Sequence, residues 1–149
     1  MAKFDLTAET VTASASKFTD ADKTLGKMDV KFVGFDTVDQ SEDDEDKSIQ
    51  KFVLRFKRTG VDTDAEVKHW LNYSYGSTAK RQKSMNYIGF TVRELQSACG
   101  KKQTALEDLN LQKALEVFDA LVGQELKIDQ HPDERADNPG KLTVSYIAA

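Results

Sequence analysis

The sequence predicts an α+β fold, mainly β, in which five strands carry the core and a helical insert separates the third strand from the fourth. Five segments alternate apolar and polar residues with a period of two, the pattern of a strand with one buried face. Between the third and fourth segments, apolar residues instead recur every three or four positions, as on one face of a helix. The 149 residues suit a single domain with one core.

The first strand is expected to start near residue 27. Met28, Val30 and Phe32 alternate with charged residues and therefore form its buried face. Gly34 lies inside the same run, where a glycine often marks a bulge or a sharp bend. We therefore expect this strand to be long and bent.

The second and third strands are expected at 49–58 and 66–75, joined by a turn at 59–62. The last two strands follow the helical insert and are separated by an Asp-Asn-Pro-Gly turn at 137–140. The inward positions of these four strands are in phase, which predicts one shared core. Its members are Phe52, Leu54, Phe56, Val67, Leu71, Leu126, Ile128, Leu142 and Val144.

The insert is expected to contain two helices. The first ends at Gly100, because glycine favours the position that follows a helix. The second starts at a capping box formed by Thr104 and Glu107 and ends before Gly123. The apolar stripes are Phe90, Val92, Leu95 and Ala98 in the first helix, and Leu115, Phe118, Leu121 and Val122 in the second.

This order of elements is that of the OB-fold, a five-stranded, partly open Greek-key barrel with a helical element between its third and fourth strands. A five-stranded sheet with helices on one face would give the same order. The long first strand with Gly34 favours the barrel, because a strand shared by both halves of a barrel has to bend.

We expect the chain to divide into a flexible N-terminal arm at 1–24, which is rich in Thr, Ala and Ser, and a single OB-like domain at 25–149. No apolar run reaches the roughly 18 residues that span a bilayer, and the first ten residues lack the apolar core of a secretory signal. Cys99 is the single cysteine, so no internal disulfide can form. We expect a cytoplasmic protein without membrane contact.

The net charge of −4 is concentrated in one acidic segment, Glu42–Asp46. Five consecutive acidic residues repel one another and are typical of a solvated loop. Without these five charges the rest of the chain carries about +1, so the acidity of the chain does not exclude an anionic partner.

The outward face of the second and third strands is the main candidate site. It combines cations with an aromatic side chain, and single-stranded nucleic acid is held by cations along the phosphates and by rings on which bases stack. The alternative is an ordinary solvated strand face, with Trp70 covered by the N-terminal arm or by a helix. The candidate residues on this face are Lys51, Arg55, Lys57, Lys68, Trp70 and Asn72.

A second basic cluster follows the third strand. Tyr75 stands at the strand end, and Lys80, Arg81 and Lys83 come directly after it. The cluster has two interpretations: an extension of a phosphate track, or the polar start of a helix.

No catalytic pattern is present, so we expect a protein that is not an enzyme and needs no cofactor or metal. The sequence contains no phosphate loop and no zinc-protease motif. His69 falls on an inward position of the third strand, where a hydrogen-bonded structural histidine is expected. His131 stands between Asp129 and Asp133 in a polar turn, a combination too common to indicate a metal site.

Several segments carry a family resemblance over residues 26–147. They are Gly26–Phe32, Phe52–Phe56, Ile88–Gly100, Leu121–Ile128 and Asn138–Lys141. In these segments the chain resembles small phage-encoded single-stranded DNA-binding proteins found with recombination and replication genes. The resemblance implies an OB-type barrel, single-stranded DNA as the ligand, the host cytoplasm as the location, and replication or recombination proteins as partners.

Two functions follow from these patterns. The first is binding of single-stranded DNA in phage replication or recombination. The second is an accessory protein-interaction module whose acidic loop at 42–46 engages a basic partner. A basic groove around Trp70 would favour the first function, and an exposed apolar patch beside the acidic loop would favour the second.

Overall fold

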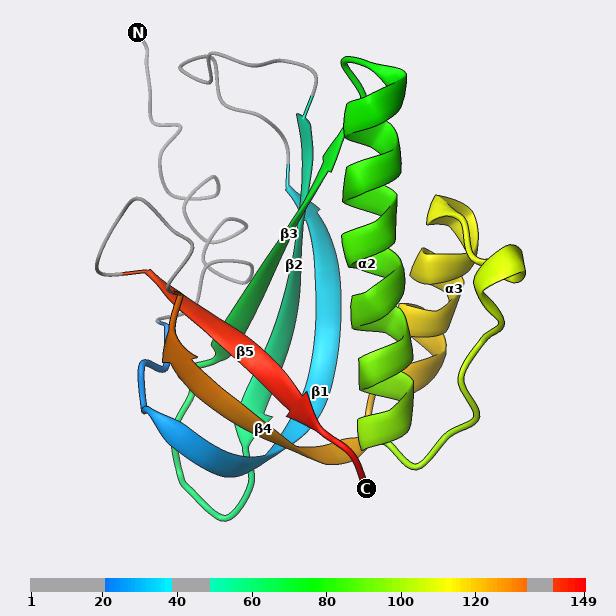
Figure 1. The fold of residues 1–149 in the computed structure, drawn as a ribbon. Coiled ribbons are helices and arrows are strands. Elements are labelled where there is room, and N and C mark those ends of the chain that lie inside the picture. Colours follow the sequence, from blue (N-terminus) through cyan, green and yellow to red (C-terminus); the bar gives the residue numbers. More distant parts are fainter. Residues whose placement is uncertain (1–20, 39–48, 134–140) are drawn as a thin grey trace, which may run out of the picture.

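A computed structural model describes residues 21–38, 49–133 and 141–149 of the chain. These residues form one sheet of five antiparallel strands, in the order β3-β2-β1-β4-β5, with helices packed against it (Figure 1). The strands are β1 (Gly26–Val38), β2 (Ile49–Arg58), β3 (Val67–Ser74), β4 (Glu125–Pro132) and β5 (Leu142–Ile147). The α+β, mainly β class is confirmed, and so is the predicted order of elements along the chain: three strands, the helices and two more strands.

Strand β1 is long, bent and shared by the two halves of the sheet. Its residues 26–31 pair with β4, and its residues 30–38 pair with β2. The register slips between Phe32 and Gly34, and Gly34 has a φ of 153°, which a residue with a side chain rarely adopts. The bulge predicted at Gly34 is therefore present. It changes the phase of the strand, so that Phe35 packs against the core.

The helix α2 (Thr78–Ala98) begins well before the predicted apolar stripe. Ser77 caps its start, because its Oγ accepts a hydrogen bond from the backbone N–H of Lys80 at 3.1 Å. The prediction that Phe90 belongs to the buried stripe is wrong: Phe90 is 58% exposed. Phe90 and Val92 are two positions apart, which places them about 200° apart around a helix.

The helix α3 (Leu111–Leu121) begins later than predicted. Asn110 caps it, because its Oδ1 accepts a hydrogen bond from the backbone N–H of Lys113 at 2.8 Å. The capping box at Thr104 is therefore wrong. Thr104 instead exchanges two hydrogen bonds with the side chain of Gln96 on α2, and the chain then makes a short 3₁₀ turn at Leu106–Asp108 before α3 starts.

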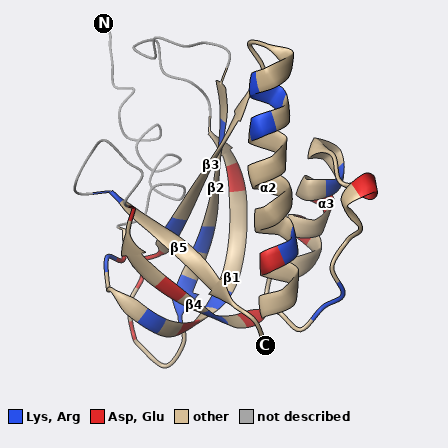
Figure 2. Ribbon diagram, viewed as in Figure 1, with Lys and Arg blue, Asp and Glu red and all other residues tan. Residues whose placement is uncertain are grey.

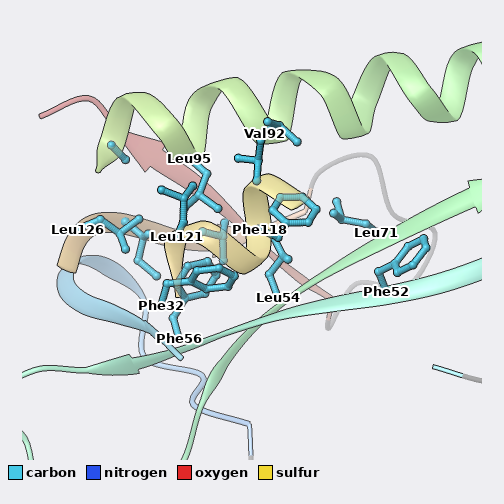
Figure 3. Packing of buried hydrophobic residues seen from close by; sticks show 14 of the residues in the cluster. Phe32, Phe52, Leu54, Phe56, Leu71, Val92, Leu95, Phe118, Leu121 and Leu126 are labelled. Carbon is cyan, nitrogen blue, oxygen red and sulfur yellow. The ribbon is translucent and has the colours of Figure 1, made fainter. Parts of the chain in front are cut away.

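The core lies between the concave face of the sheet and the two helices. Figure 3 shows Val92 and Leu95 of α2 directed toward the sheet, where the rings of Phe32 and Phe56 lie 5.2 Å apart between centroids. Eight of the nine predicted core residues belong to this cluster. The exception is Leu142, which is only partly buried at the start of β5. Each fully buried Phe or Leu contributes about 1.5–3 kcal/mol.

Three predictions fall on residues that the structure does not describe. They are the acidic loop at 42–46, the turn at 137–140 and residues 1–20 of the N-terminal arm. Neither helix in the described segments combines the length and the apolar character that crossing a membrane requires.

Candidate nucleic-acid interface

The outer face of β2 and β3 carries six of the predicted site residues. Lys51, Arg55 and Lys57 lie on β2, and Lys68, Trp70 and Asn72 lie on β3, with Arg55 opposite Lys68 and Lys51 opposite Asn72. The burial of Phe52 and Phe56 on the other face confirms this register. Trp70 is 40% exposed, whereas Val53, its cross-strand neighbour, is 4% exposed. The face is therefore partly covered at its centre and open at Trp70.

Arg55 is held by two carboxylates. Its Nη1 donates a hydrogen bond to Glu66 Oε2 at 2.9 Å, and its Nε lies 2.9 Å from Asp36 Oδ2, within ion-pair range but off-line for a hydrogen bond. Gly34 leaves room for the guanidinium, since a Cβ there would lie 2.9 Å from Arg55 Nη2. With its charge compensated twice, Arg55 organises this face rather than presenting a charge to a phosphate.

Lys57 and the second basic cluster lie at opposite ends of this surface. Lys57 Nζ is 3.7 Å from Asp64 Oδ1, an exposed pair of the weak kind. Beyond the other end of β3, Tyr75 is exposed and its ring stacks on Tyr73 with centroids 6.4 Å apart. Lys80, Arg81 and Lys83 occupy the first turns of α2 beside Tyr75, so the cluster is the polar start of a helix (Figure 2). Its role as a phosphate track stays a prediction.

A hollow of about 230 Å³ opens beside Trp70. It brings together β3, the start of β5 and the segment 21–24, and three lysines from these separate parts of the chain line it. An aromatic ring beside several cations is the combination that single-stranded nucleic acid requires. Its principal lining residues are Lys23, Lys68, Trp70, Gln130, Lys141 and Leu142.

The segment 21–24 forms one wall of this hollow and is firmly anchored, although the predicted arm included it. The backbone N–H of Asp22 donates to the carbonyl oxygen of Glu66 at 2.7 Å, and Arg58 Nε donates to Asp22 Oδ2 at 2.5 Å. Burial alone would raise the pKa of Asp22, but the hydrogen bonds from Thr24 and the charge of Arg58 outweigh it and hold this pKa below its usual value. Asp22 is therefore a compensated anion in the wall.

Gln130 ties the same segment to β4 from the buried side. Its Nε2 donates to the carbonyl oxygens of Asp22 and Thr24, both at 2.8 Å. Because both partners are acceptors, the orientation of the amide is fixed, and Oε1 is the remaining polar atom. No described residue donates a hydrogen bond to Oε1, although Gln130 is only 3% exposed and lines the hollow.

The opposite face of β3 carries His69, which is buried and fully hydrogen-bonded, as predicted. Its Nδ1 lies 2.7 Å from the hydroxyl of Tyr146 on β5, and its Nε2 lies 3.1 Å from the hydroxyl of Tyr87 on α2. Burial lowers the pKa of His69 to about 4, although the charge of Asp133 acts in the opposite direction. The ring is thus neutral at pH 7 and links the edge strand β3 to β5 and to α2.

An apolar groove lies on the far side of α2, between this helix and the 3₁₀ turn. Phe90 and Leu106 stand exposed at its rim, and Met85, Gly89 and Leu109 line it. An exposed apolar patch beside the acidic loop at 42–46 is the sign expected of a protein-interaction module. This loop lies outside the described residues, so the groove on α2 does not decide that prediction.

The residues that sequence reasoning missed are Lys23, Lys141 and Gln130. Gln130 gave a usable signal, because it is a polar residue at an inward position of β4, in phase with Leu126 and Ile128. The two lysines gave none, since each reaches the hollow only through the tertiary fold.

The described residues thus define a small sheet protein with an aromatic, lysine-lined hollow at one edge strand. Comparison with known protein families and with curated protein sequences finds no match for this chain.

Proposed function

We propose that this chain binds single-stranded DNA across the outer face of β3, without catalysis, as part of phage DNA replication or recombination. The observation that carries the proposal is the hollow at Trp70, where an exposed indole stands among Lys23, Lys68 and Lys141. Bases stack on such a ring whatever their sequence, and the lysines attract the phosphates on either side.

The strand order supports an OB-type barrel as the framework. Strand β1 pairs with both β2 and β4, the helices lie between β3 and β4, and the hydrogen bond between His69 and Tyr146 joins the two edge strands. In OB-folds, oligonucleotides lie over strands two and three and the adjoining loops. Trp70 and Lys68 are on the third strand of this order, which agrees with that location.

The path of the strand is proposed to run from the hollow along β3 toward Tyr75. Lys51 and Asn72 are cross-strand neighbours on the outer face between these two points. The basic first turns of α2, at Lys80 and Lys83, then extend the positive surface beyond Tyr75 (Figure 2). Arg55 is assigned a positioning role on this path, because Asp36 and Glu66 already hold it.

Binding of a labelled thirty-base oligonucleotide at two salt concentrations tests the proposal. Lys23, Lys51, Lys68 and Lys141 supply at least four phosphate contacts, to which Lys80 and Lys83 can add, so we predict a slope of about −3 or steeper in log affinity against log salt. Affinity should therefore fall about 60-fold or more between 50 and 200 mM salt. Absence of binding at 50 mM salt would refute the proposal and leave the protein-interaction hypothesis, in which residues 42–46 engage a basic partner.

A further inference from the structure

We infer that the hollow at Trp70 selects a nucleobase that carries an exocyclic amino group, through a hydrogen bond to Gln130 Oε1. This inference rests on the proposed function and adds a base preference to a surface that otherwise binds any sequence.

The argument starts from the fixed orientation of the Gln130 amide. Nε2 is held by the carbonyl oxygens of Asp22 and Thr24, so exchanging the two amide atoms would set three oxygens against one another. Oε1 is therefore the acceptor that remains, and among the described residues nothing donates to it. Oε1 keeps some contact with solvent, since the described side-chain atoms that are both fully buried and without a hydrogen-bond partner are Asp36 Oδ2, Arg55 Nε and Arg93 Nε. A donor on a ligand can therefore reach Oε1 and replace water there.

Gln130 lies in the lining of the hollow in which the base is proposed to stack. Gln130 and Trp70 line the same hollow, one from β4 and the other from β3. A base stacked on the Trp70 ring presents its edge, not its face, to the other walls of the hollow. Adenine, cytosine and guanine each carry an amino group that donates from an edge of the base.

The lysines at the hollow complement this contact. Lys23, Lys68 and Lys141 place positive charge around the base site, and the one carboxylate in its lining, Asp22, is compensated by Arg58. The site therefore accommodates one nucleotide unit of a strand: a base on Trp70, its amino group at Gln130, and its phosphates near the lysines.

The test compares an oligonucleotide of deoxyadenosine with the same oligonucleotide built from deoxynebularine, whose purine ring lacks the amino group. The purine ring and the phosphate charge are the same in both, so the two strands differ only in the amino group, and the variant Gln130→Met separates its hydrogen bond from its share of the stacking. The intact protein should bind the adenine strand about 2-fold to 10-fold more tightly, the effect of one hydrogen bond. Equal affinity, with Trp70 fluorescence still quenched, would overturn this inference and leave the proposed function standing. No binding of either strand would overturn both.

The variant Gln130→Met tests whether Gln130 causes the preference for the adenine strand. Methionine keeps the length of the side chain but cannot accept the hydrogen bond, so the ratio between the two strands should fall to about one. If Gln130 has only a structural role, its substitution would weaken the binding of both strands equally. The ratio of the two affinities would then be preserved, which would overturn the inference. Gln96→Met is the matched control: Gln96 is also buried, but Thr104 engages both of its amide atoms, so the ratio should not change. If Gln130→Met fails to fold, the strand comparison on the intact protein decides alone.

Discussion

His69 and Trp70 are neighbours in the sequence and point to opposite faces of β3, and the two faces differ in how completely their polar groups are paired. On the inner face, both ring nitrogens of His69 have a tyrosine hydroxyl as partner. Trp70, on the outer face, borders a hollow whose lining includes Gln130, which comes from an inward position of β4 and keeps an acceptor that no described residue engages.

This difference separates a structural site from a binding site. A buried polar group whose partners all come from the protein stabilises the fold and gains nothing from a ligand. A partly exposed ring among lysines, beside an acceptor without a donor, gains from an anionic partner that carries bases. We therefore expect substitutions on the inner face to change stability and substitutions on the outer face to change binding.

The largest expected effect is on the inner face. His69→Ala removes the partner of two tyrosine hydroxyls and opens a cavity, so the free energy of unfolding should fall by about 3 kcal/mol or more. Denaturation in urea measures it. Trp70→Ala, on the exposed side of the same strand, should cost only about 1–2 kcal/mol. Equal losses would remove the distinction between the two faces.

The pH dependence of stability follows from His69. Burial lowers its pKa from 6.5 to about 4, so between these values the unfolded chain binds a proton that the folded protein excludes. The free energy of unfolding should therefore be unaffected by this residue above pH 7 and should fall by about 3 kcal/mol as the pH drops from 6.5 to 4. Urea denaturation across this range should show the loss in the intact protein. If the variant His69→Gln loses the same free energy of unfolding over this pH range, the loss comes from groups other than His69.

The outer face is tested by the affinity of Trp70→Ala for single-stranded DNA. Loss of one stacked base should weaken binding by about 1–3 kcal/mol. Phe90→Ala is the control, because Phe90 is also an exposed aromatic but lies on α2, away from the hollow. A loss at Phe90 without a loss at Trp70 would move the interface to the groove on α2.

The smallest expected effects are those of single lysines. Lys23→Gln, Lys68→Gln or Lys141→Gln should each reduce the magnitude of the salt slope by about 0.7, the contribution of one phosphate contact on a single strand. Lys102→Gln, in an exposed loop before α3, should leave the slope unchanged. Slopes that change equally in all four variants would indicate a diffuse charge effect and not a site at the hollow.

Most of the fold was predictable from periodicity. Alternation located the five strands, and Gly34 marked the bulge in β1. The start of α2 was missed because its first turns are polar, and such turns show no apolar stripe. Leu142 was placed in the core because its phase along β5 is inward, but it stands at the strand start, beside the hollow.

The candidate site was predictable only in its strand residues. Lys68 and Trp70 fall on one face by alternation alone, and the structure places them there. The ion pairs that engage Arg55 depend on Asp36 and Glu66, which lie on or beside neighbouring strands, so a register of three strands was needed to find them. Lys23 and Lys141 meet at the hollow through contacts between distant parts of the chain, which periodicity does not encode.

The fluorescence of Trp70 during titration with single-stranded DNA tests the central claim most directly, because this is the only tryptophan in the chain. If a base stacks on the indole in the hollow, emission should be quenched in proportion to occupancy, and added salt should reverse the quenching with a slope of about −3 or steeper. Binding of DNA, measured by anisotropy, without any change in Trp70 emission would contradict the account and place the strand elsewhere on the protein.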